Sequence, residues 1–145
     1  MKVRRDAMQV MQEKKTKAIE LLSKLADAEA LEIEVDSKHV AASKNWVVRM
    51  FYDYGLADAK RHLEIATTVR GWLEQGKPPV GKIDVPTDTL EKEANSETGV
   101  ASLVKQILSS VDDGDAKALL EGILADEGRH EQGLRALKQR ALTKN

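Results

Sequence analysis

Residues 124–130 read LADEGRH, and residues 56–62 read LADAKRH. The two stretches begin 68 positions apart, and the same step back from Glu97 reaches Glu29. Each half of the chain therefore holds a glutamate that is followed, at one fixed interval, by the pattern Leu-Ala-Asp-x-x-Arg-His. An internal repeat without a gap predicts two similar halves related by an approximate two-fold axis.

The spacing of apolar residues predicts that the rest of the chain is helical. Apolar side chains recur three and four positions apart, as in amphipathic helices, and breaks rich in Gly, Pro, Ser or Asp interrupt the pattern. The predicted helices cover residues 16–42, 44–75, 88–111 and 115–142, with a helical extension over 1–15. Asp88-Thr89-Leu90-Glu91 resembles a capping box at the start of the third helix. The fold class is all-α: an antiparallel four-helix bundle with one longer crossover between its second and third helices.

Composition limits the partners and the chemistry. The 145 residues are enough for one core, so we expect a single domain over 1–145. A net charge of −1 argues against nucleic acid or an acidic membrane surface as a partner. No run is apolar enough for a signal core or a membrane span, so the expected location is cytoplasmic. The absence of cysteine excludes disulfides, thiolate zinc sites and iron–sulfur clusters on this chain. Any metal must therefore be held by His, Asp and Glu.

Acidic and imidazole side chains interrupt the apolar stripe of every predicted helix near its middle. They are Glu29 and Asp36, with Glu32 beside them, in the first helix, Asp58 and His62 in the second, Glu97 in the third, and Glu127 and His130 in the fourth. Carboxylates in a bundle core are costly unless they are paired or bind a cation.

The depths of these residues along the helices also agree. Glu97 lies about 15 residues before the break at residue 112, and Glu127 about 14 residues after it. Glu29 and Ala59 have the same relation to the break near residue 44. All four helices are therefore predicted to bring these positions to one layer, where they form a metal site.

These residues resemble the ferritin-like di-iron carboxylate proteins, in particular the rubrerythrin-type branch, here without a rubredoxin domain. That family takes one Glu from each of two helices and a Glu-x-x-His from each of the other two. The resemblance implies metal ligation by Glu29, His62, Glu97, Glu127 and His130. It also implies that Asp58 and Asp126 each bond the histidine of the opposite helix and fix its ring. The expected cofactor is two iron ions, with Mn or Zn as alternatives.

The chain departs from the family pattern at Ala59, where the second helix should supply a Glu. Glu32, Asp36 or Asp58 could take its place, or one metal could be held loosely or not at all. Glu93, one turn before Glu97, is a candidate for an extra carboxylate. Lys60 stands where bacterioferritins carry their haem-binding Met, so no haem is expected.

The resemblance implies a non-haem di-iron oxidoreductase, a peroxidase or ferroxidase that acts on peroxide, oxygen or ferrous iron. No catalytic residue is expected apart from the metal ligands, and the electron donor is unknown. Rubrerythrin-type bundles often pair, so a homodimer is the expected assembly. The alternative is a degenerate helical bundle with an incomplete metal site, which acts as an interaction or structural protein.

Overall fold

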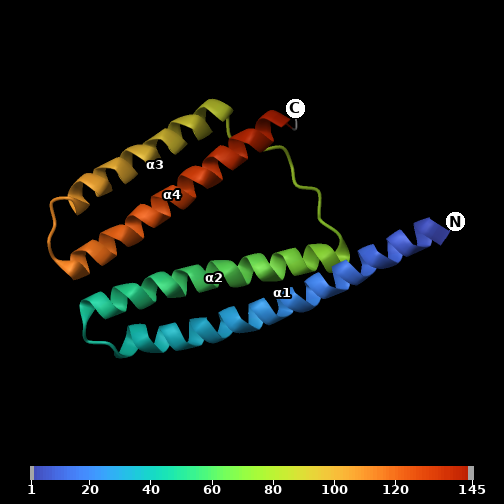
Figure 1. Cartoon of the computed structure of the whole chain (residues 1–145), viewed down its shortest axis with the longest axis horizontal. Helices are drawn as coiled ribbons and strands as arrows, with labels where there is room; N and C mark the ends of the chain where they lie inside the picture. Colours follow the sequence, from blue (N-terminus) through green and yellow to red (C-terminus); the bar gives the residue numbers. More distant parts are fainter. Residues whose placement is uncertain (1, 144–145) are drawn as a thin grey trace. The chain divides into compact units, whose positions relative to one another are not determined.

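The structure, a computed structural model, describes residues 2–143 and is all-α (Figure 1). Its four helices are α1 (Lys2–Ala42), α2 (Trp46–Gln75), α3 (Thr87–Leu108) and α4 (Gly114–Thr143). They form two antiparallel hairpins, α1 with α2 and α3 with α4, in two compact units that part between Pro79 and Val80. The four helices and the longer loop between α2 and α3 confirm the predicted element order. The packing of all four helices into one ferritin-like bundle, and a single domain over 1–145, remain predictions.

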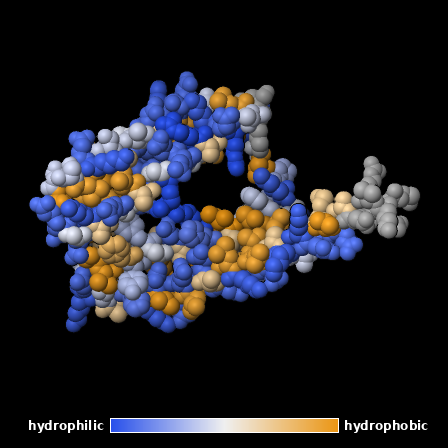
Figure 2. Space-filling view, in the orientation of Figure 1, coloured by the Kyte–Doolittle hydropathy of each residue, from blue (hydrophilic) through white to orange (hydrophobic). Residues whose placement is uncertain are grey.

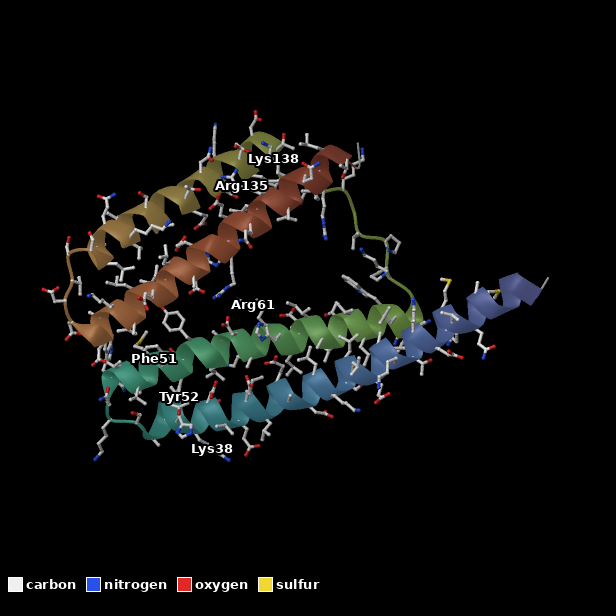
Figure 3. The ribbon with its side chains drawn as sticks, viewed as in Figure 1. Lys38, Phe51, Tyr52, Arg61, Arg135 and Lys138 are labelled. Atoms are coloured by element: carbon white, nitrogen blue, oxygen red, sulfur yellow. The ribbon has the colours of Figure 1, made fainter. Side chains whose placement is uncertain are left out.

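The first helix includes the predicted extension. α1 continues without a break from Lys2, so its 41 residues span about 60 Å, against 30 residues in α2. Three contacts, spaced along the length of α1 and α2, set the register of these two helices. The His39 ring stacks on Tyr52 at a centroid distance of 4.3 Å, Glu29 contacts His62, and Arg70 donates to Ser23. The Tyr52 side chain lies between α1 and α2 (Figure 3).

The weak break predicted near residue 44 is a short connection closed by a helix cap. Asn45 is the N-cap of α2, and its Oδ1 accepts a hydrogen bond of 3.2 Å from the backbone N–H of Val48. Ser43 supports the same turn, because its Oγ accepts from the Asn45 N–H at 3.2 Å. At its other end α2 stops at Gly76, whose φ of 91° is one that glycine adopts easily.

Asn45→Ala should destabilise the protein by about 1 kcal/mol, the usual cost of losing an N-cap side chain. Urea unfolding followed by circular dichroism measures this change. Asn45→Asp keeps an acceptor oxygen at the same place and serves as the control, with stability close to that of the wild type. Equal losses in the two variants would contradict the capping role.

The ends of α3 correct two predictions. The helix begins one residue before Asp88, its N-cap is Pro86, and no side chain caps it, so the predicted capping box is wrong. The helix also ends at Leu108 and not at Val111. Past Leu108 the backbone hydrogen bonding changes, because the Ser110 N–H bonds to the Ile107 carbonyl, three residues back, in a tighter turn than the α-helix.

Small side chains fill the interior of both hairpins. Among the side chains that the structure describes, five of the seven buried apolar residues are alanines, and the two larger ones are Leu90 and Val104 of α3. Small residues at a helix contact allow a short distance between the axes. Many larger apolar side chains remain exposed, among them Phe51, which projects from α2 away from α1 (Figure 3). Figure 2 shows apolar patches over the α1–α2 hairpin between hydrophilic residues. None of the helices in the described part is long and apolar enough to cross a membrane.

Candidate metal centre

Three of the predicted ligands meet in the α3–α4 hairpin. Glu97 of α3 and Glu127 and His130 of α4 each place one donor atom so that all three atoms lie within 4.8 Å of one another. His130 Nδ1 lies 3.8 Å from Glu97 Oε2. The two glutamates are half-buried and the histidine is exposed, so the group is open to solvent on one side. Among the described side chains this is the only such group of three or more His, Asp or Glu.

Helical spacing explains why the three residues meet. Glu127 and His130 are three positions apart on α4 and therefore lie on the same face of that helix. The α3–α4 connection is short, and Glu97 lies about as far before it as Glu127 lies after it. The antiparallel hairpin thus returns the chain to the level of Glu97, as the sequence predicted.

Two carboxyl groups close together disturb each other's ionisation. The Glu97 carboxyl raises the pKa of Glu127, chiefly by sharing a hydrogen bond with it and further through its charge. A proton between the two carboxyls relieves their repulsion, and a cation could do the same.

This shift predicts how the metal-free protein responds to pH. Because the pKa of Glu127 is raised above its ordinary value of 4.5, the folded state binds that proton more tightly than the unfolded state. The stabilisation is complete below about pH 4.5 and is lost as the pH rises through the raised pKa. Metal affinity should change in the opposite direction, because the metal displaces the proton.

Urea unfolding in the presence of a chelator, between about pH 4 and pH 7, tests this prediction. The wild type should lose stability relative to Glu127→Gln as the pH rises, because the amide carries no charge at any of these values. A difference between the two proteins that stays constant with pH, or changes in the opposite sense, would contradict the shared proton.

The α1–α2 hairpin repeats half of this arrangement. Glu29 of α1 lies 3.2 Å from His62 of α2, measured from Oε1 to Nδ1. Glu29 is 8% exposed, and its Oε2 has no hydrogen-bond partner among the described residues. Ala59, at the repeat position of Glu127, is 1% exposed. Each hairpin therefore pairs the Glu of its first helix with the His of its second, and only the α3–α4 hairpin adds a second carboxylate.

The other carboxylates named from the sequence lie outside both groups. Glu32 and Glu93 are exposed. Asp36 of α1 lies close to Gly55 of α2. A Cβ at position 55 would lie 2.7 Å from Asp36 Oδ2, so the glycine leaves room for the Asp36 carboxylate.

Asp58 and Asp126 occupy equivalent positions and make equivalent contacts. Asp58 pairs with Arg61 of its own helix at 2.6 Å, and Asp126 pairs with Arg129 in the same way. The proposed bonds from these aspartates to histidines of the opposite helix remain predictions, as does the convergence of ligands from both hairpins in one layer.

One polar contact was missed from the sequence. Glu91 of α3 accepts a hydrogen bond from Lys138 of α4 and lies 3.7 Å from Arg135, so it joins the two helices (Figure 3). The hydrogen bond from Lys138 and the positive charge of its ammonium group, with a smaller contribution from the Arg135 charge, lower the pKa of Glu91. The sequence pattern places Glu91 only in a predicted capping box, because nothing in that pattern pairs residues 47 positions apart.

Comparison with known protein families, with curated proteins and with solved structures finds no match to this chain.

Proposed function

We propose that this protein binds a divalent transition metal, iron in the first place, through Glu97, Glu127 and His130. The observation that carries the proposal is the convergence of two carboxylates and one imidazole from two helices within 4.8 Å. Glu29 and His62 form a corresponding Glu–His pair in the other hairpin, at 3.2 Å against 3.8 Å, so the repeat itself sets the register that brings Glu97 to His130.

The donor set fits such an ion. Carboxylate and imidazole ligands suit Fe(II), Mn(II) and Zn(II), whereas ions that prefer thiolates find no cysteine here. Three protein ligands leave positions for water or a small substrate, as in catalytic metal sites. The exposed edge at His130 provides access to them.

We propose an oxidoreductase activity for the iron-loaded protein, with peroxide, oxygen or ferrous iron as substrate. Bound iron supplies one-electron redox chemistry at the open position. The side chains would hold the ion, and the Glu97–Glu127 pair, whose closeness raises the pKa of Glu127 in the metal-free protein, would give up its proton when the ion binds. The electron donor for such a cycle is unknown.

Anaerobic loading with ferrous iron tests this proposal. Metal per chain is measured after desalting, and iron oxidation is then followed optically on addition of oxygen or of peroxide. We expect bound iron, and oxidation faster than that of free iron, in the wild type. Both should be lost in the double variant Glu127→Ala/His130→Ala. If the wild type retains no metal, the proposal is wrong; bound but unreactive iron would leave only metal binding.

Ala59 favours a second candidate, a helical protein whose metal site has degenerated and which serves as an interaction or structural protein. Under this alternative the Glu–His pairs satisfy each other and water. The double variant would then fold and assemble like the wild type, and neither protein would retain iron.

A further inference from the structure

The two hairpins carry the same repeat but offer a metal different sets of ligands. Glu29 corresponds to Glu97, and His62 corresponds to His130, at Glu–His distances of 3.2 and 3.8 Å. The one difference among the repeat's metal-ligating positions is Ala59, which stands in place of Glu127.

We propose that the chain binds one metal ion, in the α3–α4 hairpin, and that Ala59 prevents the α1–α2 hairpin from binding a second. The inference rests on the proposed function, because it assumes that Glu97, Glu127 and His130 bind a metal. It departs from the two ions that the family resemblance implies.

The count of available ligands supports this asymmetry. The α3–α4 hairpin brings together three ligating side chains and the α1–α2 hairpin only two. The carboxylates that could substitute for the missing one are not available at Glu29. Asp58 is paired with Arg61, Asp36 lies against Gly55, and Glu32 is exposed.

The position of Ala59 explains why this single residue decides whether the α1–α2 hairpin can bind a metal ion. Ala59 is 1% exposed, and its methyl group, which cannot bind a metal, fills the repeat position at which the other hairpin has the Glu127 carboxylate. Glu29 nevertheless remains in place, with Oε1 near His62 and Oε2 free of hydrogen bonds within the described chain. A carboxylate restored at position 59 would complete a set of two carboxylates and one imidazole.

The first test compares the two histidines, which are matched in the repeat and both about half exposed. Anaerobic titration with Co(II), followed by its visible absorption and by metal analysis, should give one equivalent per wild-type chain. His130→Ala should weaken this binding about 100-fold or more, because a direct ligand matters at least as much as its supporting contacts. His62→Ala should leave stoichiometry and affinity within about three-fold of wild type, since His62 is not a ligand of the bound ion.

The second test restores the missing ligand. Ala59→Glu should bind two equivalents of Co(II), and adding His62→Ala should return it to one. Without metal this variant should be less stable than the wild type, because it buries a carboxylate beside Glu29, and Co(II) should restore its stability. The control is Ala66→Glu, on the same helix and equally buried at 1% exposure. It should be destabilised without recovery and still bind one equivalent.

These experiments distinguish a failure of the one-ion inference from a failure of metal binding itself. One equivalent that depends on His130 and not on His62 supports the inference, even if Ala59→Glu fails to fold. Two equivalents in the wild type, or an equal loss in the two histidine variants, would overturn the inference and leave metal binding intact. If the wild type binds no Co(II), both proposals fall.

Discussion

Glu97→Ala should weaken metal binding by about 100-fold or more and so bring the chain close to metal-free at micromolar metal. Glu97 is the only ligand that α3 contributes to the cluster, and one of its oxygens lies 3.8 Å from His130 Nδ1. Its loss therefore leaves two ligands, both from α4. The measurement is a competition titration with Zn(II) and a chromophoric chelator.

Glu93→Ala is the matched control for this variant. Glu93 lies one helical turn before Glu97 on α3, carries the same charge, and is exposed outside the cluster. Its replacement should change the affinity for Zn(II) by no more than about two-fold, the effect of removing one solvent-screened charge that does not bind the ion. Similar losses in both variants would mean that net charge, and not the arrangement of ligands, attracts the metal.

Leu90→Ala should destabilise the protein by about 2–5 kcal/mol, the range for truncating a fully buried leucine. Leu90 is 2% exposed and is the largest side chain that is fully buried among the described residues. Much of a small domain's total stability, about 5–15 kcal/mol, would be lost with it. Urea unfolding followed by circular dichroism at 222 nm measures the change.

Leu103→Ala provides the comparison on the same helix. Leu103 is 56% exposed, so its truncation should cost no more than about 0.5 kcal/mol. Should the two leucine variants unfold at the same urea concentration, the interior assigned to the α3–α4 hairpin would be wrong.

Apolar periodicity predicted the helices well, because a long amphipathic segment has few alternatives to helix. The errors fell at helix ends, where single side chains decide. Asp88 has the sequence of a capping residue, yet the N-cap of α3 is Pro86, and the helix ends at Leu108, before Val111.

The repeat predicted the Glu–His pair of each hairpin, because the same interval in the sequence produces the same register across a short connection. It could not predict contacts that depend on side-chain conformation. Glu91 reaches across to Lys138 of the neighbouring helix, a contact that the periodicity of a single helix does not contain. The Asp58–Arg61 pair, by contrast, is three positions apart on one helix, where helical spacing makes side chains neighbours.

The most direct test of metal binding by this cluster is X-ray diffraction from crystals grown with ferrous iron under anaerobic conditions, with data collected on both sides of the iron absorption edge. We predict an anomalous peak about 2.0–2.2 Å from carboxylate oxygens of Glu97 and Glu127 and from a ring nitrogen of His130. Iron-loaded crystals that show no peak there, or a peak only at other residues, would contradict the assignment.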